Sequence, residues 1–339
     1  MIISAQVPEI KEYAKKHKLF VALGYFDGVH RGHQALLEAC LTMALAAGGE
    51  PCVLLLEPHP LKVLRGTESL RNLNTIEQRV ALIQKYGGFN IFILPFTREF
   101  AALTPTQFVQ EYLIDLLQVG GVVSGFNYSF GAKGLGHSAD LIEYGRRFGF
   151  QVQQVPPVKI DQEVVSSTLI RQYIENGLLQ KAASFLGHQH IFMGKVEGGN
   201  QLGSLLGFPT ANLAMDSALI WPAFGVYGAW IKDENGQIHQ AVVNVGIRPT
   251  LKQQDISPSF EAHLLNYSGN LYDTELQVIL TNRIRNEQTF PDLEALKAQV
   301  LQDKNQAIIA LQELAEVFKA QNKKWAEIFY SCLDGDLLI

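Results

Sequence analysis

A glycine-rich segment near the N-terminus places two histidines three residues apart: Gly24-Tyr25-Phe26-Asp27-Gly28-Val29-His30-Arg31-Gly32-His33. Glycine lets a backbone approach phosphate closely, and the first turn of a helix offers free N–H groups to an anion. His30 and His33 could share one face of that turn and neutralise charge developing on an α-phosphate during transfer. The segment lacks both Gly-Lys-Ser/Thr and Gly-x-Gly-x-x-Gly, the P-loop and dinucleotide signatures. It predicts a phosphate-transfer site, with a glycine-rich turn carrying incidental polar residues as the alternative.

A second polar segment follows at Ser167-Thr168, with Arg171 one turn further on. We expect Ser167 and Thr168 to cap a helix starting near Leu169 and to offer hydroxyls and N–H groups to phosphate oxygens. The fork of Arg171 would suit β- and γ-phosphates. The alternative is an ordinary helix cap followed by a surface arginine.

The second half of the chain carries a different set of candidates. Thr210 and Asn212, in Pro209-Thr210-Ala211-Asn212, supply the hard oxygen ligands that suit Mg²⁺. Glu261 lies in a predicted strand that otherwise alternates apolar residues. A plain turn and a solvated glutamate on an edge strand are the corresponding alternatives.

The first half must position its candidates on alternating strands and helices. Short apolar runs predict strands, and Ala/Leu-rich or capped segments between them predict helices. This rhythm implies right-handed crossovers and a doubly wound parallel sheet, which binds ligands beyond the carboxyl ends of its strands. The expected strands are 19–23, 52–56, 91–94 and 121–124; the expected helices are 34–47, one capped by Asn74 that runs to 85, and one opened by Thr104 and Pro105.

The rhythm changes near Leu186-Gly187. Short β-type segments separated by Gly-, Asn-, Asp- and Pro-rich turns argue for an antiparallel barrel or sandwich. Apolar residues then recur at helical spacing from Asp292 to Lys319, predicting a closing helix broken near Asp303. We therefore expect domains at 1–185 and 186–320, and a tail at 321–339 of unassigned role. The expected β segments are 191–196, 225–231, 240–245, 260–266 and 275–280.

Composition narrows the class of protein. The 339 residues contain 28 Lys and Arg against 33 Asp and Glu. The resulting net charge of −5 argues against an extended nucleic-acid-binding surface. Three scattered cysteines indicate neither a disulfide framework nor a zinc site. No run reaches the roughly 18 apolar residues of a membrane span, and the N-terminus lacks a signal-peptide core. We expect a cytoplasmic enzyme with small-molecule partners, no nucleic acid and no membrane, and leave a homo-oligomer open.

Four ordered motifs of the first half resemble one family. The histidine segment resembles the His-x-Gly-His signature of nucleotidyltransferases, in the form found in the bifunctional riboflavin kinase/FMN adenylyltransferases, the prokaryotic FAD synthetases. The other three motifs are Glu57-Pro58-His59-Pro60, Gly125-Phe126-Asn127-Tyr128-Ser129-Phe130-Gly131 and Val165-Ser166-Ser167-Thr168-Leu169-Ile170-Arg171. The resemblance extends from about residue 18 to 318.

This resemblance implies a Rossmann-like adenylyltransferase domain that makes FAD from FMN and ATP. His30, His33 and Arg171 would be catalytic, and Asn127 and Phe130 would contact the flavin. The nucleotide-binding residues would be Gly24, Phe26, Asp27, Gly28, Gly32, Ser167 and Thr168.

The second half resembles the riboflavin kinase domain of the same family, an antiparallel β-barrel that phosphorylates riboflavin to FMN with ATP. The matching segments are Gly203 to Asn212, Asn244-Val245-Gly246-Ile247-Arg248-Pro249-Thr250 and Arg285-Asn286-Glu287 with Phe290. The resemblance makes Glu261 the base for the ribityl 5′-hydroxyl, Thr210 and Asn212 the Mg²⁺ and phosphate ligands, and Arg285 and Glu287 flavin contacts. Gly203 and Gly207 would belong to a flap over ATP.

Three positions depart from the family's pattern. Val164 stands where a basic residue often precedes the Ser-Ser-Thr run, which leaves Arg31 and Lys133 as the nearest cations in its place. Ser204 replaces a flap cation, and Asp273 replaces a common glycine. Two alternatives therefore accompany the bifunctional reading: an adenylyltransferase with weakened or lost kinase activity, and a non-catalytic flavin-binding or regulatory protein.

Overall fold

The structure is a computed structural model that describes residues 3–66, 70–198, 210–248 and 257–320. Their contacts form two compact units, residues 3–167 and residues 168–320, and each is described by itself. The helices α8 (Ser167–Glu175) and α9 (Leu179–Leu186) thus group almost wholly with the second unit. The domain boundary at 185 and 186 stays a prediction from sequence.

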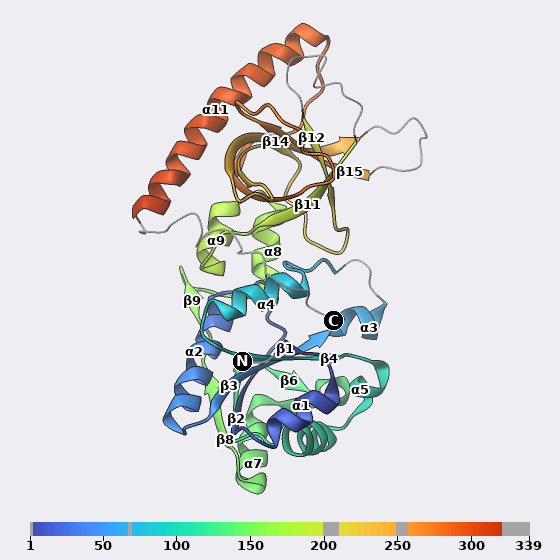
Figure 1. The fold of residues 1–339 in the computed structure, drawn as a ribbon, viewed down its shortest axis with the longest axis vertical. Helices are drawn as coiled ribbons and strands as arrows, with labels where there is room; N and C mark the ends of the chain where they lie inside the picture. Colours follow the sequence, from blue (N-terminus) through green and yellow to red (C-terminus); the bar gives the residue numbers. More distant parts are fainter. Residues whose placement is uncertain (1–2, 67–69, 199–209, 249–256, 321–339) are drawn as a thin grey trace. The chain divides into compact units, whose positions relative to one another are not determined.

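The first unit is a six-stranded parallel sheet, coloured blue to green in Figure 1, with strand order β1-β4-β3-β2-β5-β8. Every neighbouring pair is parallel, as the alternation of strands and helices predicts. The strands are β1 (Ile3–Ser4), β2 (Leu19–Leu23), β3 (Glu50–Glu57), β4 (Asn90–Pro95), β5 (Gly121–Gly125) and β8 (Gln151–Val155). Four two-residue strands form separate antiparallel pairs: β6 (Ser129–Phe130) with β7 (Gly136–His137), and β9 (Lys159–Ile160) with β10 (Glu163–Val164).

Helices connect these strands. They are α1 (Val7–Ala14), α2 (Arg31–Ala46), α3 (Pro60–Arg65), α4 (Ile76–Gln84), α5 (Arg98–Ala102), α6 (Pro105–Phe108) with its π-helical continuation η1 (Val109–Leu116), the short η2 (Ala132–Gly134) and α7 (Ser138–Phe148). Thr104 caps α6 and Pro105 opens it, as expected. The expected Asn74 cap is wrong by one residue: Thr75 caps α4 in a reciprocal pair with Gln78, while Asn74 lies buried just before it.

The second unit is built on a closed antiparallel barrel with strand order β11-β12-β15-β14-β13-β16. Figure 1 shows its strands closing into a ring, in yellow to orange. The strands are β11 (Phe192–Glu197), β12 (Ala211–Met215), β13 (Gly225–Lys232), β14 (Ile238–Arg248), β15 (Ser257–Leu264) and β16 (Glu275–Arg285). Sequence reasoning missed β12, because it is short and follows a Pro-Thr step typical of turns.

The closing helix α11 (Leu293–Ala320) lies against β13, β14 and β16. The expected break near Asp303 is wrong, since α11 is continuous over 28 residues. Asp303 is nearly fully buried and accepts a hydrogen bond from Arg285 of β16, which accounts for an aspartate inside the helix. Within the described ranges, no helix is long and apolar enough to cross a bilayer.

Candidate active sites

The two histidines of the first motif form a stacked pair at the start of α2. Their ring centroids lie 3.7 Å apart with an interplanar angle of 10°. His30 caps the helix, because its Nδ1 accepts a hydrogen bond from the His33 backbone N–H at 3.2 Å. Burial, then the neighbouring His30 and Arg79, hold the pKa of His33 well below its usual value. The His33 ring is therefore neutral near pH 7, and a neutral imidazole carries one ring N–H that can donate a hydrogen bond.

This pair lies where an open parallel sheet binds ligands. β2 lies between β3 and β5 in the sheet. The strand order runs from β2 through β3 and β4 toward one edge and through β5 to β8 at the other edge, so its direction reverses between β2 and β5. Such a reversal leaves a crevice beyond the carboxyl ends of the strands. The glycine-rich turn leaves β2 at Gly24, and the predicted flavin loop leaves β5 at Gly125. Tertiary structure thus brings the predicted nucleotide and flavin segments to neighbouring strand ends.

Backbone geometry explains why glycine stands at two positions of the turn. Gly28 has φ +82°, which side chains rarely adopt. A Cβ on Gly32 would lie 3.1 Å from Cε1 of His30, so a larger residue would press on the capping ring. The turn also holds Phe26 and Val29 at φ +57° and +39°, which is strained for residues with side chains. Gly24, the first residue of the turn, follows β2 directly.

Asp27, predicted to bind nucleotide, is buried and holds a neighbouring loop. Its carboxylate accepts hydrogen bonds from the backbone N–H groups of Leu73 at 2.9 Å and Asn74 at 3.2 Å. Its backbone carbonyl accepts a bond from the Ser167 hydroxyl at 3.0 Å. The carboxylate therefore links the glycine-rich turn to the loop before α4, and its role toward nucleotide stays a prediction.

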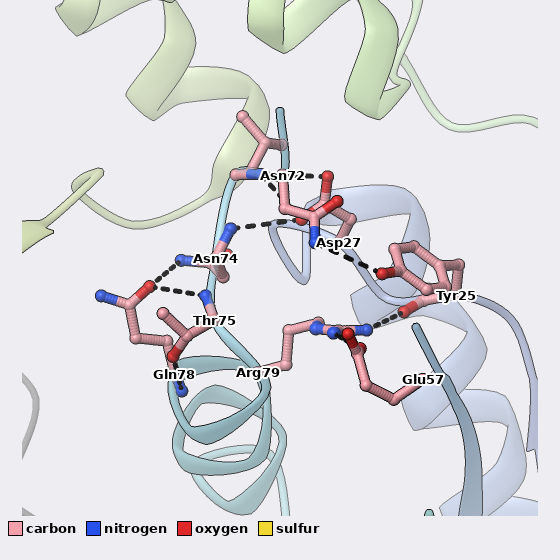
Figure 2. Close-up of polar contacts among 9 residues, drawn as sticks. Tyr25, Asp27, Glu57, Asn72, Asn74, Thr75, Gln78 and Arg79 are labelled. Carbon is pink, nitrogen blue, oxygen red and sulfur yellow. Dashed lines mark hydrogen bonds and ion pairs between the residues drawn. The ribbon is translucent and has the colours of Figure 1, made fainter. Parts of the chain in front are cut away.

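Sequence reasoning missed a polar network around Tyr25, which Figure 2 draws. Arg79 of α4 is fully buried, pairs with Glu57 at the end of β3 and donates from Nη1 to the Tyr25 carbonyl at 3.2 Å. Asn72 donates to the Tyr25 hydroxyl at 3.4 Å. One signal was available, because Arg79 is spaced four residues before Ile83 on the apolar side of the predicted helix.

The helix α8, predicted to bind phosphate, starts two residues earlier than expected. Ser167 and Thr168 therefore belong to its first turn, where backbone N–H groups lack intrahelical partners. Arg171 lies one turn further along the same helix. Ser167, the last of these residues in the first unit, bonds to the Asp27 carbonyl of the glycine-rich turn.

The two predicted flavin contacts differ in exposure. Asn127 is exposed in the turn between β5 and β6. Phe130 is 6% exposed and packs against Phe108, with ring centroids 5.4 Å apart, and against Tyr128 at 5.9 Å. The Phe130 ring thus belongs to the aromatic core under the loop, where hydrophobic burial explains its type.

The barrel aligns the second set of candidates in one cross-strand row. Asn212 of β12 pairs directly with Glu261 of β15, which pairs in turn with Asn244 of β14. Residues paired in this way project on one face with Cβ atoms about 5 Å apart. The neighbours Leu213, Ala262 and Val243 are buried, so the row faces away from the barrel interior. Thr210 lies two residues before Asn212, directly before β12.

Arg285 and Glu287, the predicted flavin contacts of the barrel, both bond within the protein. Arg285 donates to Asp303 of α11 from Nε at 2.9 Å and from Nη2 at 2.7 Å. Glu287 accepts a hydrogen bond from the Ile247 backbone N–H at 3.3 Å. These contacts fix both side chains at the end of β16 and beside β14, and their contact with flavin stays a prediction.

Several predicted residues lie outside the described ranges, namely Gly203, Ser204 and Gly207 of the flap, and Pro249 and Thr250 of the later loop. Asp273, by contrast, is described and has φ +66°, the conformation that favours glycine. Its carboxylate pairs with Lys195 at 3.0 Å between two exposed side chains. The replacement of glycine therefore leaves the turn in its left-handed form.

Comparisons with known proteins match both halves. The FAD synthetase family model matches residues 12–169, and the riboflavin kinase family model matches residues 186–311. The chain is 35% identical to the bifunctional riboflavin kinase/FMN adenylyltransferase of Listeria monocytogenes, covering 84% of this chain and 89% of that protein. It is 32% identical to the protein of the same name from Bacillus subtilis, covering 88% and 94%.

A solved structure agrees over most of the chain. A crystal structure described as a macrolide-efflux protein from Streptococcus pneumoniae superposes with a TM-score of 0.80 at 28% identity, covering 90% of this chain and 97% of that one. Two family models in the expected order, together with relatives above 30% identity along nearly their whole length, establish the family. The chain belongs to the bifunctional riboflavin kinase/FMN adenylyltransferases.

Proposed function

We propose a division of labour for the family's two reactions. The parallel-sheet unit, with helix α8, adenylylates FMN to FAD, and the barrel phosphorylates riboflavin to FMN. The stacked His30 and His33 at the carboxyl end of β2 carry the first assignment. The direct pairing of Asn212 with Glu261 carries the second.

In the adenylylation step, a phosphate oxygen of FMN attacks the α-phosphorus of ATP. The new P–O bond forms as the bond to the β-phosphate breaks, and pyrophosphate leaves. No base is needed, because the FMN phosphate is largely ionised at pH 7. His33, neutral because of its lowered pKa, donates a hydrogen bond to the oxygens that gain charge, and His30 orients it by stacking. Ser167, Thr168 and Arg171 serve the remaining phosphates from α8.

In the kinase step, the ribityl 5′-oxygen of riboflavin attacks the γ-phosphorus of ATP and ADP leaves. Glu261 takes the hydroxyl proton as the new P–O bond forms. Asn244, paired with Glu261 on the other side from Asn212, lies within the loop motif of this domain. Strand pairing fixes all three backbones, which limits the motion of the base.

The donor set in this row fits Mg²⁺. Thr210 and Asn212 would hold it with hydroxyl and amide oxygens, and it would neutralise charge on the ATP phosphates. Mg²⁺ typically takes few protein ligands and completes its shell with water and phosphate.

Location, partners and the boundary between residues 185 and 186 belong to the same proposal. We expect a cytoplasmic enzyme whose partners are ATP, riboflavin and FMN, without nucleic acid or membrane. Neither a single-activity adenylyltransferase nor a non-catalytic flavin binder is favoured by the comparisons, because both family models match.

Reciprocal variants test the division of labour. Each protein is incubated with ATP and Mg²⁺, and with either riboflavin or FMN, and the flavins are separated over time. Glu261→Gln is expected to form no FMN from riboflavin while still making FAD from supplied FMN. His30→Ala is expected to accumulate FMN and to lose about 100-fold or more in FAD formation. Loss of both activities in either variant contradicts the assignment.

A further inference from the structure

The turn that leads to His30 is strained and needs external support. Phe26 and Val29 both have positive φ, a strained conformation that persists only where the surrounding structure determines it. Val29 is β-branched, which makes its conformation rarer still. The position of the histidine pair therefore depends on whatever fixes the backbone between Gly24 and Val29.

The helix α4 and the loop before it supply much of that support. The Asp27 carboxylate bonds to the backbone of residues 73 and 74, and Arg79 bonds to the Tyr25 carbonyl at 3.2 Å. The strained Phe26 lies between these two attachment points. Figure 2 shows Arg79 reaching from α4 toward Tyr25 and Glu57.

Arg79 makes three interactions with its planar group. Its Nη2 pairs with the Glu57 carboxylate, and its Nη1 donates to the Tyr25 carbonyl of the turn. Its Cζ lies 4.5 Å from the centroid of the Tyr25 ring. The residue is fully buried, so its side chain offers no exposed surface to a substrate. The pair joins a buried guanidinium to a partly exposed carboxylate, and it contributes little net stability, because desolvation of the arginine offsets the attraction. Stability alone is thus a weak reason for a cation at this position.

The backbone that Arg79 fixes leads directly to the reacting groups. The buried Phe26 ring lies 4.9 Å from the His33 ring, and His33 stacks on His30. A shift of the Tyr25 carbonyl would therefore move Phe26 and, with it, the histidine pair. We propose that Arg79, anchored by Glu57, is a positioning residue for adenylyl transfer that holds the turn carrying His30 and His33. This inference rests on the proposed role of that pair.

The test compares Arg79→Gln and Arg79→Lys with Gln84→Met. Gln84 lies at the other end of α4 and also bonds to a backbone carbonyl, that of Phe89, so it controls for loss of a helix-to-backbone bond. The kcat of FAD formation is expected to fall about 100-fold in Arg79→Gln, since small misplacements have effects of this size, with KM for ATP and FMN unchanged. Arg79→Lys keeps the charge but not the planar fork of donors, so its kcat is expected to lie between those of Arg79→Gln and the parent. Gln84→Met is expected to match the parent.

Riboflavin kinase activity in the same samples reports on the barrel and is expected to be unchanged. A folded Arg79→Gln protein with kcat within twofold of the parent overturns the proposal, as does an effect on KM alone, which would indicate substrate contact. If Arg79→Gln does not fold, Glu57→Gln serves in its place, because Glu57 is partly exposed and the change preserves its size. Its kcat is then expected to fall about tenfold at constant KM, and an unchanged kcat would refute the anchor. A parent protein that makes no FAD from FMN would instead refute the proposed function.

Discussion

The pair formed by Arg285 and Asp303 allows a quantitative test of how the closing helix is attached. Asp303 is 4% exposed in its side chain and Arg285 is 20% exposed, and two charge-assisted hydrogen bonds join them. Removing one partner of a buried pair costs about 3–5 kcal/mol. Because Arg285 is partly exposed, we expect a loss near about 3 kcal/mol from the broken pair. The better helix propensity of alanine offsets about 0.5 kcal/mol of this loss. Asp303→Ala should therefore lower the free energy of unfolding of the barrel unit by about 2.5 kcal/mol.

Intrinsic fluorescence isolates this unit. All three tryptophans, Trp221, Trp230 and Trp325, follow residue 168 in the sequence, so urea unfolding followed by tryptophan emission does not report directly on the first unit. The matched control is Glu313→Ala, an exposed position on the same helix, for which we expect a change within about 0.5 kcal/mol.

The double variant Arg285→Ala with Asp303→Ala completes the cycle. It should cost less than the sum of the two single changes, because the second change no longer leaves a buried charge alone. An Asp303→Ala protein as stable as the Glu313→Ala control would show that the pair does not attach α11, and the reasoning would be wrong.

Three further outcomes are expected. Burial lowers the pKa of His190 to about 3, whereas the unfolded chain binds this proton below about pH 6.5. The contribution of His190 to the free energy of unfolding is therefore complete above about pH 6.5 and falls by about 1.4 kcal/mol per pH unit as the pH drops toward 3. His190→Leu should remove that slope in urea titrations at several pH values, and an unchanged slope assigns it elsewhere. Asp27→Ala leaves two buried backbone N–H groups without their acceptor and should destabilise the first unit by about 3 kcal/mol, measured by calorimetry against the exposed control Asp115→Ala. Gly32→Ala should lower the kcat of FAD formation with little change in melting temperature, because the added Cβ contacts the His30 ring. A kcat equal to that of the parent protein would show that displacement of this ring is tolerated.

Local pattern was enough for much of the fold. The run Leu19–Leu23 reads as a buried parallel strand, and all five residues are buried in β2. The cap at Thr104 and the proline after it could likewise be placed from sequence, because a helix start depends on neighbouring residues only. The same reasoning placed Asn74 as a cap one residue early, since Asn and Thr are both good caps and the reciprocal pair of Thr75 with Gln78 forms instead.

Long-range partners account for what local pattern missed. Asp303 reads as a helix breaker because an aspartate in a helix interior is unfavourable by propensity, yet its partner Arg285 lies on a barrel strand. Arg79 carried no motif, and its bond to Tyr25 spans 54 residues of sequence. The packing of Phe108 and Tyr128 around Phe130 likewise joins separate segments, and the contact of Phe130 with flavin, expected by resemblance, stays a prediction.

The sequence by itself determined the alternation of strands and helices, the later antiparallel segments, and the residue types that phosphate chemistry requires, since these are set by short-range spacing. Only the tertiary structure decided that His30 and His33 stack, that Asn212 pairs with Glu261, and that a buried Arg79 supports the turn before the histidines. The physical reason is that strand register and burial arise from contacts between distant segments, and these contacts determine the charge, orientation and accessibility of each side chain.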